Sequence, residues 1–368
     1  GHMDVPKKVS GALIEWTTGT TPAASDNVPK NTPFKLKQAW KKKAWDTILS
    51  GPVSAGSTVA VYSSDSKVHL FDIQSGASKG FTSISNASSG ARKNHKNGFA
   101  VKNRIIIPVH TSKSMGSDPN ALVCIDAGSR KEVWRIPNRA GIFSSINGSE
   151  KHNVIGFGSH DTYFHLIDEK TGKEQWKIQT GVSCASGGRY GNNTVYVAGT
   201  GGIWGCDIKN GTKKWHVKIP MSFGKDNISI DGTKGLLFAG FAREIACFSI
   251  KDGKKKWAVP SVCSAPPAIC TTLVLFPLAN GKLTALNTGN GIKKWESPLE
   301  TRYAPACGDG KAAVLSESGR VYVFDGKDGK ICAVSEPVFD IGFPVVSTDK
   351  GWTGILKTGE VVGLILGK

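Results

Sequence analysis

Short apolar runs separated by turn-forming residues follow one another along the whole chain. A typical run is Val321-Tyr322-Val323-Phe324, which is rich in β-branched and aromatic residues. The spacing of apolar positions is that of short strands, and helical periodicity is essentially absent. The pattern therefore predicts an all-β fold made of many short strands.

One segment of this pattern repeats. In its clearest copy, residues 165–176, an apolar run ends at Asp168, Gly172 lies in the following turn, and Trp176 comes eight residues after the Asp. The same frame recurs at Asp126 to Trp134, Asp207 to Trp215, Ser249 to Trp257 and Asn287 to Trp295, and in part at Asp72 to Gly80 and Asp325 to Ala333. These starts lie about forty residues apart, which is room for four short strands, the size of one β-propeller blade.

The two ends of the chain supply one more repeat. Residues 359–366 match the run that precedes the Asp, but the chain ends before another turn and Trp. Residues 34–40 offer the missing strand and its Trp40. If these strands pair, the ring closes and leaves no open sheet edge. We therefore predict that residues 34–368 form an eight-bladed β-propeller of four-stranded antiparallel blades, closed by N- and C-terminal strands that share one blade.

The repeated residues have a structural explanation. An Asp at a strand end can accept hydrogen bonds from the next turn, Gly permits a positive φ there, and Trp offers a large face for packing between blades. We interpret the following residues as structural blade-docking positions, and not as catalytic ones: Asp126, Trp134, Asp168, Gly172, Trp176, Asp207, Trp215, Trp257 and Trp295.

The segment Asp168-Glu-Lys-Thr-Gly-Lys-Glu-Gln-Trp176, with its copies, resembles the tryptophan-docking motif of the PQQ-like, or quinoprotein alcohol dehydrogenase-like, β-propellers. The resemblance covers about 90% of the chain. It implies the fold strongly and the function weakly, because this family includes dehydrogenases, the barrel-assembly lipoprotein BamB and propellers appended to adenylate-forming enzymes.

The resemblance also implies where enzymatic members differ from this chain. Those members hold PQQ and calcium on the propeller axis with carboxylate and amide ligands, and they often carry a disulfide between adjacent cysteines. No adjacent cysteine pair occurs here, and the 368-residue chain is shorter than those enzymes. We therefore expect the non-catalytic branch, like BamB or an appended propeller, with no catalytic residue, no metal and no cofactor.

Eight cysteines are present without any CxxC spacing, which excludes a zinc ribbon. Several lie inside apolar runs, as Cys124 and Cys247 do, where cysteine acts as a small buried hydrophobe. Unpaired cysteines favour a reducing, cytoplasmic compartment, although the spacing leaves disulfides between neighbouring repeats open. No apolar run approaches the ~20 residues of a transmembrane helix, so we predict no membrane insertion.

The first residues do not fit the repeat. Gly1-His2-Met3 is typical of what remains after a purification tag is cleaved, and the polar residues that follow have little apolar area to bury. We expect residues 1–33 to be a tag remnant and a flexible linker.

Two other motifs contain residue types that can carry chemistry. The glycine-rich segment 199–205 resembles a dinucleotide-binding loop, but it falls between two predicted strands, which favours a hairpin turn. His160, Asp161 and His165 could form a metal or acid–base pair, although a structural hydrogen bond is the favoured interpretation.

The chain is strongly basic, with 47 Lys and Arg against 29 Asp and Glu and a formal charge of +18. About half of these cations fall in predicted outer hairpins and strands, which would place them on one rim. Such a rim attracts anionic partners, while the alternative is that exposed turns are Lys-rich for solubility. Nucleic acid is a less favoured anionic partner, because Lys far outnumbers Arg and the aromatic residues are mostly docking Trp residues.

Candidate partner-binding residues come from two departures from the repeat. The unit that begins at Asp72 is longer than the others, and the extra residues lie in 86–103 or in 111–119. The first of these segments carries a basic cluster that could contact an acidic surface or form a disordered, solvated loop: Arg92, Lys93, His95 and Lys96. Rare arginines also precede or begin the predicted innermost strands, where they should face the axial funnel: Arg139, Arg189 and Arg302, the last with Tyr303. The alternative is that these arginines satisfy backbone carbonyls between blades.

These observations favour a non-enzymatic scaffold that docks protein partners in a larger assembly, or a regulatory module of a longer protein. The alternatives are a ligand-sensing or PQQ-type redox module that uses the central funnel, and a binder of anionic polymers through the Lys-rich rim.

Overall fold

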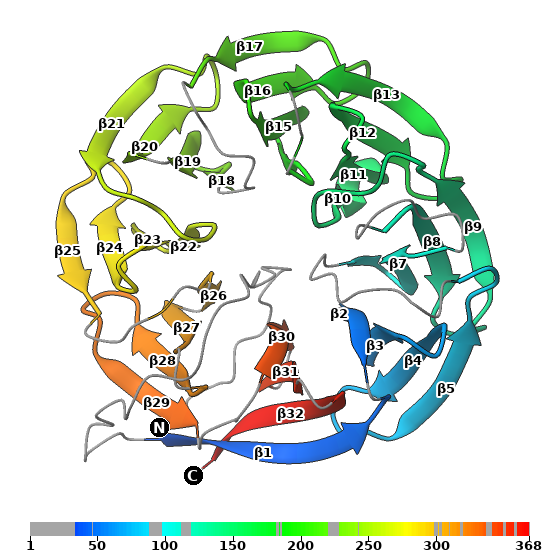
Figure 1. Ribbon diagram of the computed structural model, residues 1–368. Coiled ribbons are helices and arrows are strands. Elements are labelled where there is room, and N and C mark those ends of the chain that lie inside the picture. Colours follow the sequence, from blue (N-terminus) through cyan, green and yellow to red (C-terminus); the bar gives the residue numbers. More distant parts are fainter. Residues whose placement is uncertain are drawn as a thin grey trace.

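The computed structural model describes residues 34–45, 47–87, 98–111, 119–181, 184, 186–219, 228–241, 243–297, 301, 304–308, 310–316, 319–335, 341–348, 351–356 and 359–367. Antiparallel sheets of four strands stand around a central axis and form a closed ring of eight blades (Figure 1). The predicted all-β, eight-bladed architecture is confirmed.

In each of the first four blades, four consecutive strands run from the axis to the outside. Blade I contains β2 (Ile48–Ala55), β3 (Thr58–Ser63), β4 (Lys67–Asp72) and β5 (Ser78–Ser83); blade II contains β6 (Phe99–Val101), β7 (Arg104–Val109), β8 (Ala121–Asp126) and β9 (Glu132–Pro137). Blade III contains β10 (Asn147–Ser149), β11 (Val154–Gly158), β12 (Tyr163–Asp168) and β13 (Glu174–Gln179), with a 3₁₀ turn, η1 (Glu150–His152), after β10; blade IV contains β14 (Arg189–Gly191), β15 (Thr194–Gly199), β16 (Gly202–Asp207) and β17 (Lys213–Val217).

The next three blades repeat the arrangement, and the last one takes strands from both ends of the chain. Blade V contains β18 (Ile228–Asp231), β19 (Leu236–Gly240), β20 (Glu244–Ser249) and β21 (Lys255–Pro260); blade VI contains β22 (Ala268–Cys270), β23 (Leu273–Pro277), β24 (Leu283–Asn287) and β25 (Lys293–Glu296). Blade VII contains β26 (Ala306–Gly308), β27 (Lys311–Leu315), β28 (Val321–Asp325) and β29 (Ile331–Ser335); blade VIII contains β30 (Ile341–Thr348), β31 (Gly351–Leu356), β32 (Glu360–Gly367) and β1 (Phe34–Lys43).

The ring is closed as the sequence predicts. Strand β1 runs antiparallel to β32, in a register that begins with Lys35 opposite Gly367 and ends with Lys43 opposite Glu360. The start of β1 also pairs in parallel with β29, Phe34 lying opposite Ala333, so blades VII and VIII share one eight-stranded sheet. Figure 1 shows the two terminal strands side by side at the ring's edge.

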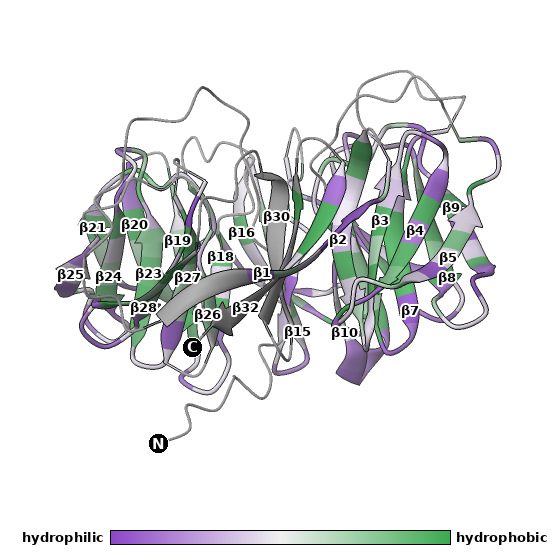
Figure 2. Cartoon of the chain, turned by 90° about the horizontal axis from the view of Figure 1, so that it is seen from below, coloured by the Kyte–Doolittle hydropathy of each residue, from purple (hydrophilic) through white to green (hydrophobic). Residues whose placement is uncertain are grey.

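The hydrophobic core lies between neighbouring blades. Between blades II and III, for example, Ile106, Ile155 and Trp134 belong to one buried cluster. Equivalent clusters lie at the other seams from blade VIII, through blades I to VI, to blade VII. Figure 2 shows strands that are largely hydrophobic and connecting turns that are more polar. Among the described residues, no helix is long and apolar enough to cross a membrane.

The repeated residues form the same contacts at successive seams. The carboxylate of Asp168 accepts hydrogen bonds from the backbone N–H groups of Lys170 and Thr171, at 3.0 and 2.8 Å. Gly172 has a φ of +70°, and a Cβ added there would lie 2.9 Å from the ring of Trp134. The Trp134 indole N–H donates to the carbonyl of Glu169 at 2.8 Å. Each docking Trp therefore packs on the turn of the next blade, where only a glycine leaves room for its ring.

Candidate functional site

The innermost strands of blades II to VII surround a cavity of about 690 Å³ on the axis of the ring. Its wall is mostly small and apolar. Among the residues that line it, Glu150 is the single carboxylate and Arg189 the single Lys or Arg side chain. Because clefts of this size are where small ligands usually bind, the cavity is the first candidate for a functional site.

Arg189 begins β14 and is half-buried in the cavity wall. Its Nη1 donates to the carbonyl oxygen of Gly188 at 3.0 Å. The next residue, Tyr190, donates its hydroxyl proton toward the carbonyls of Gly187 (3.0 Å) and Asn147 (3.3 Å), which joins blades III and IV. The arginine predicted to face the funnel is therefore at its wall, with a neighbouring tyrosine that holds two blades together.

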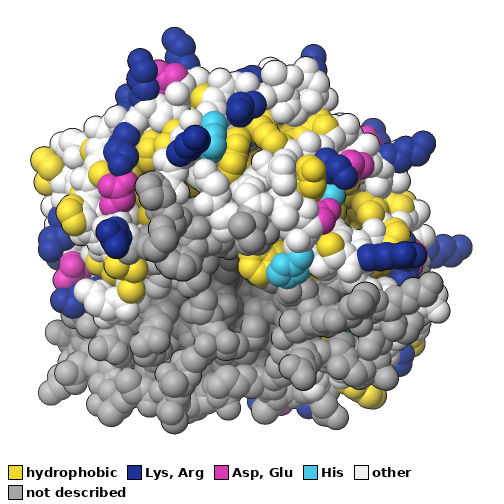
Figure 3. Space-filling view, turned by 45° about the horizontal axis from the view of Figure 1, so that its top comes forward, with side chains coloured by type: hydrophobic (Ala, Val, Ile, Leu, Met, Phe, Trp, Pro, Cys, Tyr) yellow, Lys and Arg dark blue, Asp and Glu magenta, His cyan; other side chains and the backbone are white. Residues whose placement is uncertain are grey.

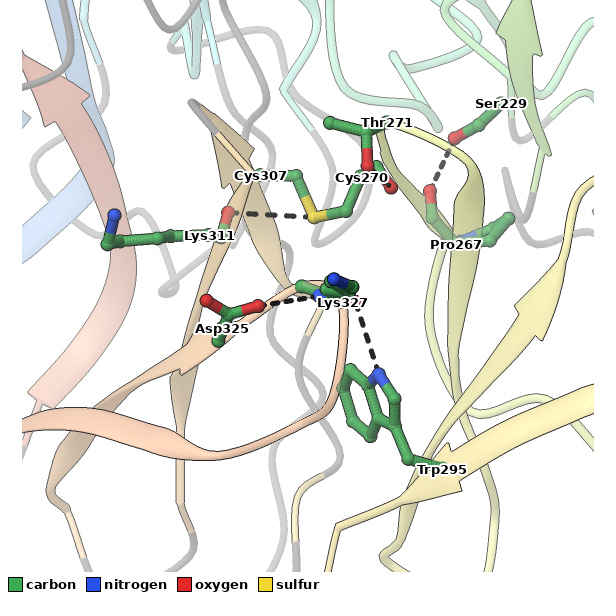
Figure 4. Close-up of a disulfide and its surroundings, with 10 residues drawn as sticks. Ser229, Pro267, Cys270, Thr271, Trp295, Cys307, Lys311, Asp325 and Lys327 are labelled. Atoms are coloured by element: carbon green, nitrogen blue, oxygen red, sulfur yellow. Dashed lines mark hydrogen bonds between the residues drawn. A yellow bond between two sulfur atoms is a disulfide. The ribbon is translucent and has the colours of Figure 1, made fainter.

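A disulfide lies at the same wall. Cys270 at the end of β22 and Cys307 in β26 are bonded, and Cys307 lines the cavity (Figure 4). The preferred interpretation of the cysteines as unpaired hydrophobes is wrong for this pair, because the innermost strands of adjacent blades bring two distant positions together. The expectation of a reducing compartment rested on unpaired cysteines, and these two cysteines no longer support it.

The remaining cysteines fit the packing interpretation. Cys124, Cys184, Cys206, Cys247 and Cys263 are buried, and Cys332 is half-buried. Burial raises the pKa of the thiols of Cys124, Cys206 and Cys247 to about 12, because a thiolate would lose its hydration there. These thiols stay protonated near neutral pH and are poor nucleophiles.

The lining of the cavity does not fit the quinone and calcium of the enzymatic propellers. Calcium takes six to eight oxygen ligands, usually several of them carboxylates. The described wall offers one carboxylate, that of Glu150. The described part of the chain has no group of three or more His, Cys, Asp or Glu that could hold a metal. The donor set of this wall is therefore too small for a calcium site of that kind.

The His165 motif is a structural hydrogen-bond cluster. Nε2 of His165 lies 2.9 Å from Asp161 and Nδ1 lies 2.6 Å from Glu174, while the ring stacks on Phe157 at 4.9 Å between centroids. Because carboxylates occupy both ring nitrogens, neither nitrogen is open to a metal or a substrate. The glycine-rich segment is likewise the β15–β16 hairpin, in which Gly199 pairs with Gly202.

The other predicted partner residue that the structure describes, Arg139, does not line the cavity. Arg139 is exposed in the turn between β9 and β10. Six further candidates lie outside the described residues: Arg92, Lys93, His95, Lys96, Arg302 and Tyr303. Of the two predicted partner residues that the structure describes, Arg189 lines the axial cavity and Arg139 does not.

A second candidate site lies on the outer wall and was seen in the sequence only as a general basic rim. The outer strands of blades IV, V and VI each carry two exposed lysines directly before the docking Trp, namely Lys213-Lys214, Lys255-Lys256 and Lys293-Lys294. Lys and Arg side chains project around the described periphery in Figure 3. The sequence does contain a signal for these lysine pairs, because they occur directly before the Trp in three consecutive repeats.

Comparison with solved structures places the ring among known propellers. The quinohemoprotein alcohol dehydrogenase ADHIIG from Pseudomonas putida HK5 aligns over 90% of this chain and 76% of its own, with a TM-score of 0.66 and 13% identity. The computationally designed protein Ika8 aligns over 88% of this chain and 97% of its own, with a TM-score of 0.66 and 13% identity. At such low identity these similarities show the fold alone.

Sequence comparison adds a relative of higher identity over a shorter aligned region. A quinoprotein ethanol dehydrogenase from Pseudomonas putida is 33% identical over 119 residues, in an alignment that covers 27% of this chain and 18% of the relative. The match thus spans less than a fifth of the relative's length. The family model described as outer membrane protein assembly factor BamB matches residues 82–258 and 232–336. Because these matches cover more than half of the chain, the protein belongs to this family of PQQ-like β-propellers.

Proposed function

We propose that the protein is a rigid, non-enzymatic docking platform for protein partners, either within a larger assembly or as a regulatory module of a longer protein. The observation that carries this proposal is the chemistry of the described axial wall. It offers a single carboxylate and a single guanidinium, without the ligand set that the enzymatic propellers use. A stiff ring with exposed charged outer strands is suited to positioning other proteins.

The comparisons support this proposal in part. The matching family is named for an assembly factor, and assembly factors act through protein contacts. The curated relative is named for a dehydrogenase, but the alignment covers only 18% of it. We infer that the chain shares the dehydrogenases' repeat and not their reaction.

The test is reconstitution with a defined partner. Proteins crosslinked to the purified ring in an extract of its own cells are identified, one is produced alone, and its affinity for the ring is measured by titration calorimetry. A saturable complex with purified components is expected. The proposal fails if the ring forms no such complex and instead oxidises alcohols after incubation with PQQ and Ca²⁺.

A second candidate function is the sensing of a small anion in the axial cavity. The observation in its favour is the half-buried Arg189, the single cationic side chain among the lining residues. Calorimetry with inorganic phosphate and with oxalate tests it, with Arg189→Gln as the variant. Binding that disappears in this variant supports sensing, and heats no larger than dilution for both anions exclude it for these two ligands.

A further inference from the structure

A β-bulge occurs in the outer strand of each of blades I to VII, directly before the docking position. In blade IV, Cys206 pairs with Lys213 and Gly205 pairs with Trp215, so Lys214 has no partner across the sheet. The same register shift leaves one outer-strand residue without a cross-strand partner in each of these seven blades. These bulged residues are Lys79, Val133, Gln175, Lys214, Lys256, Lys294 and Cys332. A bulge leaves the extra residue out of the ladder and re-aims its side chain.

In blades I and IV, the bulged lysine is neutralised within its own blade. Nζ of Lys79 lies 3.3 Å from the carboxylate of Asp72, and Nζ of Lys214 lies 3.3 Å from that of Asp207. Both ammonium groups also donate to a carbonyl in the β-turn between the two inner strands, Ser57 at 2.9 Å and Asn193 at 3.2 Å. The repeat Asp therefore has two roles, because it organises its turn and it pairs with the bulged lysine.

Blades V and VI keep the lysine and lose the carboxylate. Ser249 and Asn287 stand where the Asp would be, while Lys256 and Lys294 occupy the bulge. The turn survives: Oδ1 of Asn287 accepts from the N–H of Gly289 at 2.9 Å, and Oγ of Ser249 accepts from the N–H of Lys251 at 3.3 Å. Only the negative charge is gone.

The two lysines consequently have no partner among the described residues. Within the part of the chain that the structure describes, neither Lys256 nor Lys294 forms a hydrogen bond or an ion pair, and both are exposed. Nearby carboxylates are already engaged by other lysines. Glu244 pairs with Lys255, Glu296 pairs with Lys282 at 2.9 Å and with Lys293 at 3.8 Å, and Asp252 pairs with Lys254 at 3.7 Å. Unlike their counterparts in blades I and IV, these ammonium groups are available to an external anion.

The two positions belong to one surface. Trp257, next to Lys256, donates its indole N–H to the carbonyl of Thr288 at 3.0 Å and packs on Gly291, so the outer strand of blade V meets the turn of blade VI. That turn ends in Ile292, which is 59% exposed. Lys293 and Lys294 follow Ile292 in the chain, and Lys251 and Lys254 lie in the turn of blade V that leads into β21; all four are exposed. We call the group Lys251, Lys254, Lys256, Lys293 and Lys294, with Ile292, the lysine patch.

We propose that the lysine patch binds an acidic segment of a protein partner that also carries an apolar residue. This inference rests on the proposed docking function and names the chemistry of the partner. Carboxylates would take the place of the missing Asp side chains, and Ile292 would be covered by the apolar residue. Lysines, as flexible point charges, suit carboxylates of varied geometry.

The surface is less suited to nucleic acid. The indoles beside these lysines are used for docking: Trp257 and Trp295 each donate to a backbone carbonyl, at 3.0 and 3.2 Å, and each packs on a glycine. Their faces are therefore not available as stacking platforms for bases. The patch contains no arginine, and its exposed Ile292 matches an apolar side chain better than a phosphate backbone.

The test uses a fluorescein-labelled peptide of twelve residues, Asp and Glu with one central Leu, and fluorescence anisotropy at 50 and 300 mM NaCl. The variant is Lys256→Gln with Lys294→Gln. The matched control is Lys170→Gln with Lys173→Gln, which removes the same charge from exposed positions of blade III. A third protein, Ser249→Asp with Asn287→Asp, keeps both lysines and restores the carboxylates of the repeat.

Removing the two lysines is expected to weaken peptide binding about fivefold or more, with less than a twofold change in the control. Restoring the two Asp residues should weaken binding to a similar extent, since each lysine regains its internal partner. Three results would overturn the proposal. The first is an equal loss of peptide affinity in the variant and in the control, and the second is the absence of saturable peptide binding. The third is tighter binding of a twelve-nucleotide single-stranded DNA than of the peptide. A reconstituted partner that binds the Lys256/Lys294 variant as tightly as the native ring would overturn it too, while leaving the docking function intact.

Discussion

The guanidinium of Arg130 lies over Gly80, across the seam between blades I and II. A Cβ added at Gly80 would come 2.7 Å from Nη1 of Arg130, which also donates to the carbonyl of Lys79 at 3.2 Å. Gly80 stands where most blades have the docking Trp, and Arg130 stands where they have the turn glycine, with a φ of 59°. At this seam the large and the small residue have changed places.

This exchange predicts a coupling between the two positions. Gly80→Trp alone forces an indole against Arg130 and should destabilise the protein by about 1–3 kcal/mol. Adding Arg130→Gly restores the Trp–Gly pair of the other seams, so the double variant should be more stable than Gly80→Trp alone. Urea unfolding of the two single variants and the double variant gives the coupling free energy. Strictly additive effects would show that the two residues do not act as a pair.

The sequence was sufficient for the fold because its strongest signals are local and repeated. The Asp–Gly–Trp frame, complete or in part, marks blades I to VII, and the leftover strand at residues 34–40 indicates how the ring closes. The Arg130–Gly80 contact was not predictable in the same way. The sequence shows Gly80 in the place of a Trp, but only the three-dimensional seam shows that the side chain filling the gap comes from the next blade.

The candidate sites were predicted less well, for a physical reason. The strand register decides which of two neighbouring lysines occupies the bulge. A carboxylate seven residues earlier decides whether that lysine is neutralised, as Asp207 does for Lys214. A count of charges along the chain treats Lys214 and Lys256 alike. The disulfide between Cys270 and Cys307 depends in the same way on how close adjacent blades come at the axis.

Ring closure through β1 leads to a second prediction. Removing residues 1–43 exposes the edge of β32 and removes Trp40, whose indole N–H donates to the carbonyl of Ile73 at 3.2 Å. Loss of such a buried Trp alone costs about 3–5 kcal/mol. We expect an unstable, self-associating protein in size-exclusion chromatography with light scattering. Removing residues 1–33 is the control and should leave a stable monomer; a monomeric, equally stable chain without β1 would contradict the closure.

Acid should weaken the blade turns. Hydrogen bonds from the backbone and side chain of Ser75 lower the pKa of Asp72 from its usual 3.8 to about 2, and the pKa values of Asp126 and Asp207 are lowered too. Because the folded pKa is depressed, this stabilisation is complete above about pH 4 and is lost as the pH falls toward 2. Thermal unfolding between pH 7 and pH 2 should show the midpoint falling in that window.

Asp72→Asn isolates the contribution of this carboxylate. Asn287 shows that an amide oxygen can organise the turn, since it accepts from the N–H groups of Gly289 and Asn290 at 2.9 and 3.3 Å. At pH 7 the variant should therefore lose little beyond the exposed ion pair with Lys79, about 0–1 kcal/mol. Between pH 4 and pH 2 its midpoint should fall less steeply than that of the native protein. An unchanged slope would mean that Asp72 does not contribute to the acid sensitivity.

The disulfide between β22 and β26 gives a fourth prediction. It joins residues 37 apart and so restricts the unfolded chain, which for a loop of this size is worth about 2–4 kcal/mol. Dithiothreitol should lower the free energy of unfolding by that amount, and should have no such effect on a Cys270→Ser, Cys307→Ser variant. Of the six free cysteines, only Cys332 is not buried, so a thiol reagent should label at most one site in the native protein and six after unfolding without reductant. Eight labelled thiols under those unfolding conditions would show that the bond between the blades does not form.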